Sequence, residues 1–236
     1  MIEKLPLYIS IVFGLTTLAT LTLFYYALKR SQIGISKTNI ILASLTVWLI
    51  IQAILTLNNF YNSDTRSLPP KFLLLVIPPL LTLLFLFITE NGRKFMDALS
   101  LRHLTYVHVV RVPVELVLYW LFLNKAVPEL MTFTGRNFDI LAGITAPLVA
   151  YYGFDRQGLK RKTLLIWNIL ALGLVLNIVI HAVLSAPFPI QQLAFDQPNI
   201  AVLYFPFSWL PGFIVPVVLF GHLVSIRRLI RSNRTK

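Results

Sequence analysis

The stretch LPLYISIVFGLTTLATLTLFYYAL, residues 5–28, runs for 24 residues without a charged side chain. One helical crossing of a bilayer needs about 20 consecutive apolar residues. In hydrocarbon a backbone must satisfy its own polar groups, and a helix does so within a single segment. The run is longer than the apolar core of a signal peptide, and no small-residue cleavage site follows it. It is therefore predicted to be a membrane-spanning helix.

Six further apolar runs follow, each closed by charged or turn-forming residues. The chain is 57% hydrophobic and only 13% charged, with a mean hydropathy of +0.76, which is too apolar for a soluble fold of this length. We therefore expect an all-α integral membrane protein, a seven-helix bundle formed by one domain over residues 1–236. The predicted helices are Leu5–Leu28, Asn39–Phe60, Phe72–Thr89, Leu104–Leu123, Asn137–Phe154, Thr163–Leu184 and Ile200–Ile226.

Two of these segments contain prolines that should disturb a straight helix. The pair Pro78-Pro79 removes two backbone donors from the third segment and predicts a kink or a broken span there. Pro206 and Pro211 predict that the outer part of the seventh segment is irregular.

Basic residues are distributed unequally between the two sides. Fifteen Lys and Arg residues fall in the loops after the first, third and fifth segments and after the seventh. The opposite side holds five, and Arg111 lies inside a segment. By the positive-inside rule the N-terminus is outside and the C-terminus is cytoplasmic, as expected for an inner or plasma membrane. The five residues on the outer side are Lys4, Arg66, Lys71, Lys125 and Arg136.

The net charge of +12 does not indicate a nucleic-acid partner, because the basic residues flank apolar runs and suit the anionic face of a membrane. The basic tail, residues 227–236, is an expected topology anchor that could also bind lipid headgroups or a cytoplasmic protein. The bilayer is thus the first expected partner.

Several chemistries are excluded by residue type. The chain has no cysteine, so it has no disulfide, thiolate metal site or cysteine nucleophile. Every lysine falls in a loop or tail, which excludes a retinal Schiff base inside the bundle. No zinc-hydrolase motif occurs, and no metal site is predicted.

The fourth segment carries the most ionisable groups at membrane depth. His108, Arg111 and Glu115 are spaced by three and four residues, which places them on one face of a helix that must point into the bundle. Two readings stay open. Arg111 and Glu115 could form an ion pair along the helix that locks it to its neighbours, or they could form a substrate or proton site.

Other polar residues lie in the following segments. Asp139 is expected near the outer end of the fifth segment, with Arg136 as its simplest partner. Asn177 and His181 share one face of the sixth segment. With Glu115, these residues predict a pocket that opens outward under the loop 185–199; that loop resting on lipid headgroups is the alternative. His222, in the seventh segment, is expected at the depth of His108.

Three functions follow from these patterns. The leading one is binding or transport of a small molecule or lipid through the outward-facing polar pocket. The second is a non-catalytic structural or partner-binding membrane component. The third is a membrane-embedded enzyme or a haem or quinone redox protein, for which His108 and His222 are the one histidine pair at matching depth.

Overall fold

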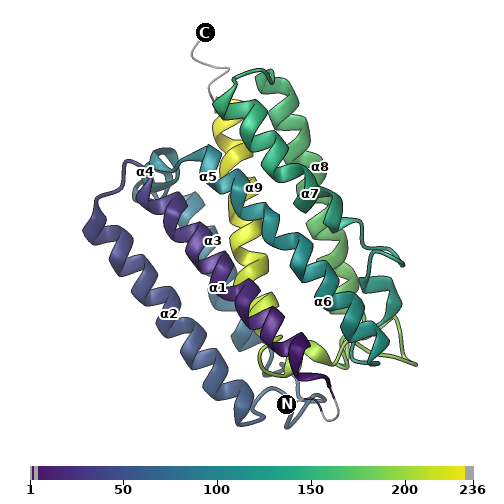
Figure 1. Cartoon of the computed structure of the whole chain (residues 1–236). Helices are drawn as coiled ribbons and strands as arrows, with labels where there is room; N and C mark the ends of the chain where they lie inside the picture. The colour runs from purple at the N-terminus through teal and green to yellow at the C-terminus, as the bar shows by residue number, and fades with distance from the viewer. Residues whose placement is uncertain (1, 3–4, 232–236) are drawn as a thin grey trace.

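The computed structural model describes residue 2 and residues 5–231, which form helices joined by loops (Figure 1). No strand occurs among these residues. The helices are α1 Leu7–Lys29, α2 Ile35–Leu57, α3 Leu73–Ile88, α4 Glu90–Ala98, α5 Leu101–Val107, α6 Arg111–Leu123, α7 Asp139–Ala150, α8 Arg161–Leu184 and α9 Val215–Arg231.

Five helical stretches are long and apolar enough to cross a membrane: Leu7–Lys29, Ile35–Leu57, Leu101–Leu123, Arg161–Leu184 and Leu210–Arg231. The bent pair α3–α4 would make a sixth. The α7 helix is 12 residues long and continues into a five-residue π-helical turn, Tyr151–Asp155. The protein is therefore an all-helical chain with several helices of membrane-spanning length.

The third predicted segment breaks at its end, not at its prolines. Pro78 and Pro79 lie inside the continuous α3 helix. The chain bends by 93° between α3 and α4, where Thr89 adopts an extended conformation and its side chain accepts a hydrogen bond from the amide of Gly92 at 3.1 Å. Thr89 thus caps α4, and this capping bond gives the break a physical cause.

One end of the bundle gathers the loops after α1, α3–α4 and α7 together with the end of α9. The amide of Gln32 donates to the carbonyl of Ala98 at 3.1 Å, and Arg102 forms an ion pair with Asp155 at 2.8 Å. The basic loops of the sequence therefore meet at the same end. Three of the basic residues used to predict the orientation lie outside the described residues: Lys4, which was predicted on the outer side, and Arg234 and Lys236, which were predicted on the cytoplasmic side.

The opposite end gathers the loops after α2, α6 and α8. The amide of Ile200 donates to the carbonyl of Ala126 at 3.1 Å, and the side-chain amide of Asn62 donates to the hydroxyl of Tyr204 at 2.8 Å. Consecutive connections thus alternate between the two ends, and α1 begins at the end opposite to where α9 ends (Figure 1).

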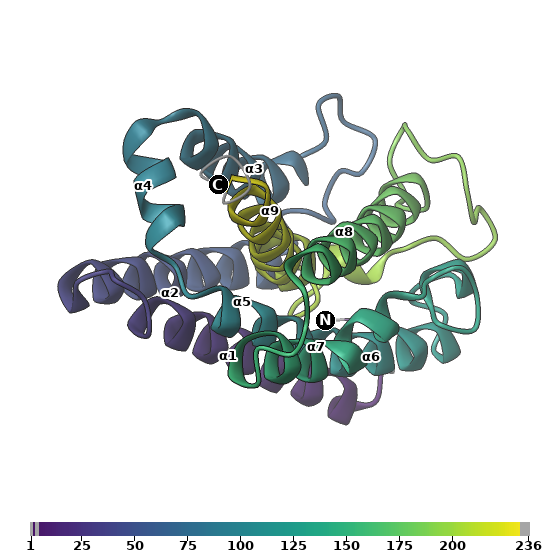
Figure 2. The ribbon, with the colours of Figure 1, turned by 90° about the horizontal axis from the view of Figure 1, so that it is seen from above.

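Apolar side chains cover the outside of the bundle and polar ones occur within it. Leu15 on α1, Phe85 on α3 and Leu170 on α8 are 60%, 66% and 66% exposed. In contrast, Arg111 and Glu115 are 2% and 1% exposed. Seen from above, α9 lies between α3 and α8 (Figure 2). This distribution suits an apolar solvent around the helices.

Asp97, on α4, connects that helix to the end of α9. Its carboxylate forms ion pairs with Arg227 and Arg231, the second at 2.7 Å. Burial raises the pKa of Asp97, but the hydrogen bond from Arg227 and the nearby arginine charges lower it more, and the resulting pKa is below the usual value. A lowered carboxyl pKa stabilises the fold at neutral pH, and this contribution disappears as the pH falls through the folded-state pKa.

We therefore expect Asp97→Asn to lower the melting temperature at neutral pH, with the difference from wild type shrinking as the pH falls below about 4, the ordinary pKa of an aspartate. Thermal melting of both proteins in detergent at several pH values measures this difference. A difference that stays constant over the whole pH range would show that the Asp97 charge does not stabilise this end of the bundle.

Candidate functional site

Arg111 and Asp139 form the central ion pair of the site. Arg111 begins α6, directly after the 3-10 turn His108–Val110, and Asp139 begins α7. The Arg111 Nε donates to Asp139 Oδ2 at 2.6 Å, and Nη2 contacts Oδ1, so the pairing is bidentate. Two predicted alternatives are therefore wrong: Asp139 does not pair with Arg136, and Arg111 does not pair along its helix with Glu115. The ion pair between the Arg111 guanidinium and the Asp139 carboxylate instead joins α6 to α7.

Arg111 also contacts α8 and α9. Its Nη1 lies 3.0 Å from His222 Nε2, and its Nη2 donates to the carbonyl of Ala171 at 3.0 Å. A guanidinium can only donate, so His222 Nε2 accepts, and Nδ1 carries the hydrogen that is donated to Asn168 Oδ1 at 3.0 Å. One buried arginine thus connects four helices.

His108 stacks on His222. The two imidazole rings are 3.7 Å apart between centroids and are inclined by 10°. Gly221 allows this approach, because a Cβ at that position would lie 3.1 Å from His108 Cε1. Neither ring nitrogen of His108 has a partner among the described residues.

The predicted haem ligation by His108 and His222 does not fit this arrangement. Two axial histidines must hold the iron, and the macrocycle around it, between them. Imidazoles in face-to-face contact leave no room there. The described part of the chain also contains no group of three or more potential metal ligands.

Glu115 lies one turn after Arg111 and is held by Asn137. The Asn137 Nδ2 donates to Glu115 Oε1 at 2.5 Å and to the carbonyl of Met131 at 3.0 Å. The Asn137 Oδ1 accepts a hydrogen bond from the amide of Asp139 at 3.0 Å. The second carboxyl oxygen, Glu115 Oε2, is buried without a partner among the described residues.

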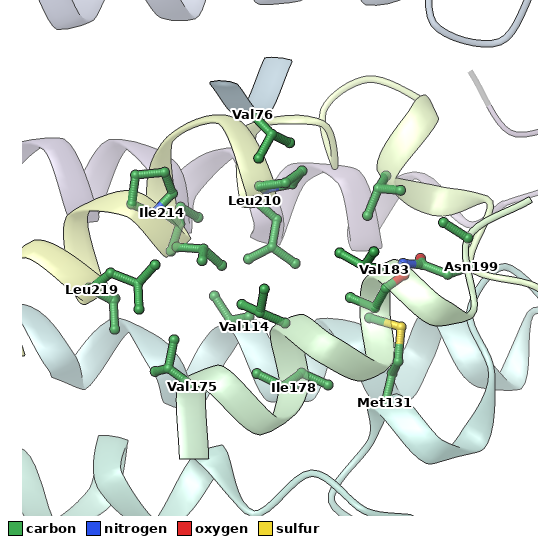
Figure 3. Close-up of a pocket in the computed structure, with 18 of the residues that line it drawn as sticks. Val76, Val114, Met131, Val175, Ile178, Val183, Asn199, Leu210, Ile214 and Leu219 are labelled. Atoms are coloured by element: carbon green, nitrogen blue, oxygen red, sulfur yellow. Dashed lines mark hydrogen bonds between the residues drawn. The ribbon is translucent and has the colours of Figure 1, made fainter. Parts of the chain in front are cut away.

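A cavity of about 200 Å³ lies beside these groups. Its walls come from α3, α6, α8, α9, the Leu210–Val215 region and the loop 185–199, and its ionisable lining residues are Arg111, Glu115 and Asp139. Figure 3 shows Val76 and Leu210 on one side of the cavity, with Val175 and Ile178 on the other. The remaining wall is mostly apolar, so the cavity combines a hydrophobic body with a small number of polar groups, as ligand sites do.

Asn177 and His181 lie outside the cavity lining. The Asn177 Nδ2 donates to the carbonyl of Arg136 at 2.9 Å, and His181 Nδ1 lies 2.8 Å from the carbonyl of Asn177. Asn177 therefore connects α8 to the loop before α7, whereas His181 bonds within its own helix. Of the predicted polar residues, the structure brings together His108, Arg111, Glu115, Asp139 and His222.

Two asparagines of this network were missed as site residues. Asn168 lies near the start of the predicted segment Thr163–Leu184, where an asparagine carries no signal of its own. Asn137 is the first residue of the predicted segment Asn137–Phe154. Its position two residues before Asp139 is a usable signal, since Asn side chains often bond the backbone two residues further on.

A comparison with protein families matches residues 68–230 to the family described as Domain of unknown function (DUF8737). No curated protein and no solved structure matches the chain. The cavity lining runs from Pro70 to Leu219, so all of it falls within the matched range.

Proposed function

We propose that this chain, which belongs to the family described as Domain of unknown function (DUF8737), is a multi-pass membrane protein that binds a small molecule or lipid in the cavity beside Glu115. The unpartnered oxygen of Glu115 carries this proposal. Glu115 is 1% exposed and lines the cavity, yet Oε2 has no partner among the described residues. An unsatisfied buried polar atom costs roughly 1–3 kcal/mol, which the polar group of a ligand would recover.

The proposed topology has seven crossings, with the N-terminus outside and the C-terminus in the cytoplasm. The crossings are α1, α2, α3, the α5–α6 stretch, α7 with its π-helical turn, α8 and α9. Two observations support it. Successive connections lie at alternate ends of the bundle, and the end that gathers the basic loops would face the cytoplasm.

The absence of cysteine allows a clean test of this topology. Single cysteines at the exposed positions Ser63 and Gln192 should react with a membrane-impermeant maleimide in intact cells. Cysteines at the exposed positions Lys37 and Lys160 should react only after the membrane is permeabilised. Labelling of all four positions in intact cells would contradict the proposed crossings, and the reverse pattern would contradict the orientation.

Ligand binding is tested with Glu115→Gln. Native mass spectrometry of the purified chain, incubated with a total lipid extract of the cells that express it, should detect a discrete bound mass. We expect Glu115→Gln to weaken retention of that mass by roughly tenfold or more, because a buried polar group of the ligand would lose its partner at Oε2, which costs about 1–3 kcal/mol. The control is Glu129→Gln, which changes an exposed carboxyl of the same chemistry and should retain the adduct.

A structural role is the second candidate, because Arg111 connects four helices through its ion pair and hydrogen bonds. The same variants separate the two. If Glu115→Gln lowered the melting temperature while wild type held no adduct, the polar residues would serve to lock helices together, and the binding function would be rejected.

A further inference from the structure

We infer that the cavity binds a neutral lipid with a hydroxyl-bearing head, which enters sideways from the bilayer between α3 and α8. This inference rests on the proposed binding function and adds the ligand class and the route. Four observations support it: the size of the cavity, the exposure of its rim, the pairing of most Arg111 N–H groups within the protein, and two oxygens in the cavity lining that have no hydrogen-bond partner.

The cavity is too small to enclose a complete amphiphile. Its volume is about 200 Å³, whereas pockets that enclose a small-molecule ligand measure about 300–1,000 Å³. A head group and a few carbons would fill it. The rest of such a ligand must project out of the protein, so the ligand needs an apolar part that is stable outside.

The cavity opens on a face that would be in contact with lipid. Leu80 on α3 and Val183 on α8 both line the cavity, yet they are 43% and 41% exposed. In Figure 2 α9 lies between these two helices, and its residues Val218 and Leu219 also line the cavity. Because exposed apolar residues of spanning helices face acyl chains, a ligand tail between α3 and α8 would lie among lipid tails.

Arg111 and Asp139 neutralise each other, and Glu115 is the remaining ionisable group of the lining. The Arg111 guanidinium pairs with Asp139, and four of its five N–H groups have partners. A phosphate head would therefore place a negative charge beside two carboxyl groups, with one guanidinium N–H left to pair it, which is expensive inside a membrane. The site disfavours an anionic head.

Two oxygens in the cavity lack donors. One is Glu115 Oε2, and the other is Asn199 Oδ1, whose residue is 0% exposed and whose Nδ2 donates to the carbonyl of Ala182 at 3.2 Å. An amide oxygen can only accept, so the ligand must donate. A hydroxyl donates to either oxygen, whereas a ketone or quinone carbonyl has no hydrogen to donate. This requirement selects a hydroxylated neutral lipid such as a monoacylglycerol.

The test uses two photoreactive probes with the same alkyne-bearing, diazirine-bearing chain, one a monoacylglycerol and the other the free fatty acid. The full chain is reconstituted in phosphatidylcholine bilayers, irradiated, and digested to map the labelled residues. We expect the monoacylglycerol to label α3 between Leu73 and Leu80 and α8 between Val179 and Val183, about tenfold more than the fatty acid does.

Two variants test the route and the head contact separately. Val183→Trp should block the opening, and Glu115→Gln should remove the acceptor, each lowering monoacylglycerol labelling about tenfold. Leu170→Trp is the matched control, because Leu170 is an exposed α8 residue outside the cavity lining. Glu115→Asp keeps a carboxyl in the site, and retention of labelling by this variant excludes misfolding as the cause of the loss.

The outcomes distinguish the inferred ligand class and route from the proposed binding function. Equal labelling by both probes, unaffected by Val183→Trp, would overturn the hydroxyl lipid and its lateral route. If water-soluble monobutyrin bound in a Glu115-dependent way while the long-chain probe did not, the inference would fail and the proposed function would stand. If neither compound bound in a Glu115-dependent way, both would fail.

Discussion

Replacing Arg111 with Met should lower the free energy of unfolding by about 3–5 kcal/mol, because the change leaves the Asp139 carboxylate buried without its bidentate partner. Arg111 is 2% exposed, so water cannot replace the lost contacts. His222 also loses the donor at its Nε2. Thermal or chemical denaturation of the purified variant in detergent, compared with wild type, measures the loss.

The double variant Arg111→Met/Asp139→Leu tests whether the loss comes from the unpaired Asp139 charge. Removing both charges leaves an apolar contact, so much of the lost stability should return. Arg136→Met, at an exposed arginine, is the matched control and should change stability by no more than about 0.5 kcal/mol. The single variant Asp139→Leu is measured as well. If the double variant lost as much stability as the two single variants lose together, the pairing of Arg111 with Asp139 would be contradicted.

Gly143→Leu should be the next most damaging change. Gly143 lies on α7, where a Cβ would come within 2.9 Å of the backbone nitrogen of Val112 and 2.8 Å of its Cγ2. A leucine would force α6 and α7 apart, and these helices carry Arg111 and Asp139. We expect a loss of about 1–3 kcal/mol or more from overpacking, measured by the same denaturation experiment.

Gly173→Leu provides the control for this prediction. Gly173 is also helical, but a Cβ there would meet nothing within 4 Å. It should therefore accept leucine with little change in stability. Similar losses at the two glycines would show that the close contact between α6 and α7 is not the cause.

Hydropathy predicted the straight helices well. The segment Leu5–Leu28 corresponds to α1, Leu7–Lys29, and Thr163–Leu184 corresponds to α8, Arg161–Leu184. These runs contain few breakers, so the length of the uninterrupted apolar run indicates the extent of each helix. The predicted segment Ile200–Ile226 is irregular over its outer part, as its prolines indicated, because α9 begins only at Val215, after a π-helical turn that contains Pro211.

The partners of the charged residues were harder to predict. Helical spacing shows which residues share a face, so it placed His108, Arg111 and Glu115 together. It does not show which helices are neighbours. The pairing of Arg111 with Asp139 depends on the packing of α6 against α7, which close approach at Gly143 permits. No periodicity within one segment contains that information.

The most direct test of ligand binding is a high-resolution structure in a lipid bilayer that contains monoacylglycerol. We predict elongated density between α3 and α8 that ends within hydrogen-bond distance of Glu115 Oε2. A cavity closed by packed side chains, with Glu115 Oε2 bonded only to protein, would contradict the proposed function and leave Arg111 and its partners as a structural lock.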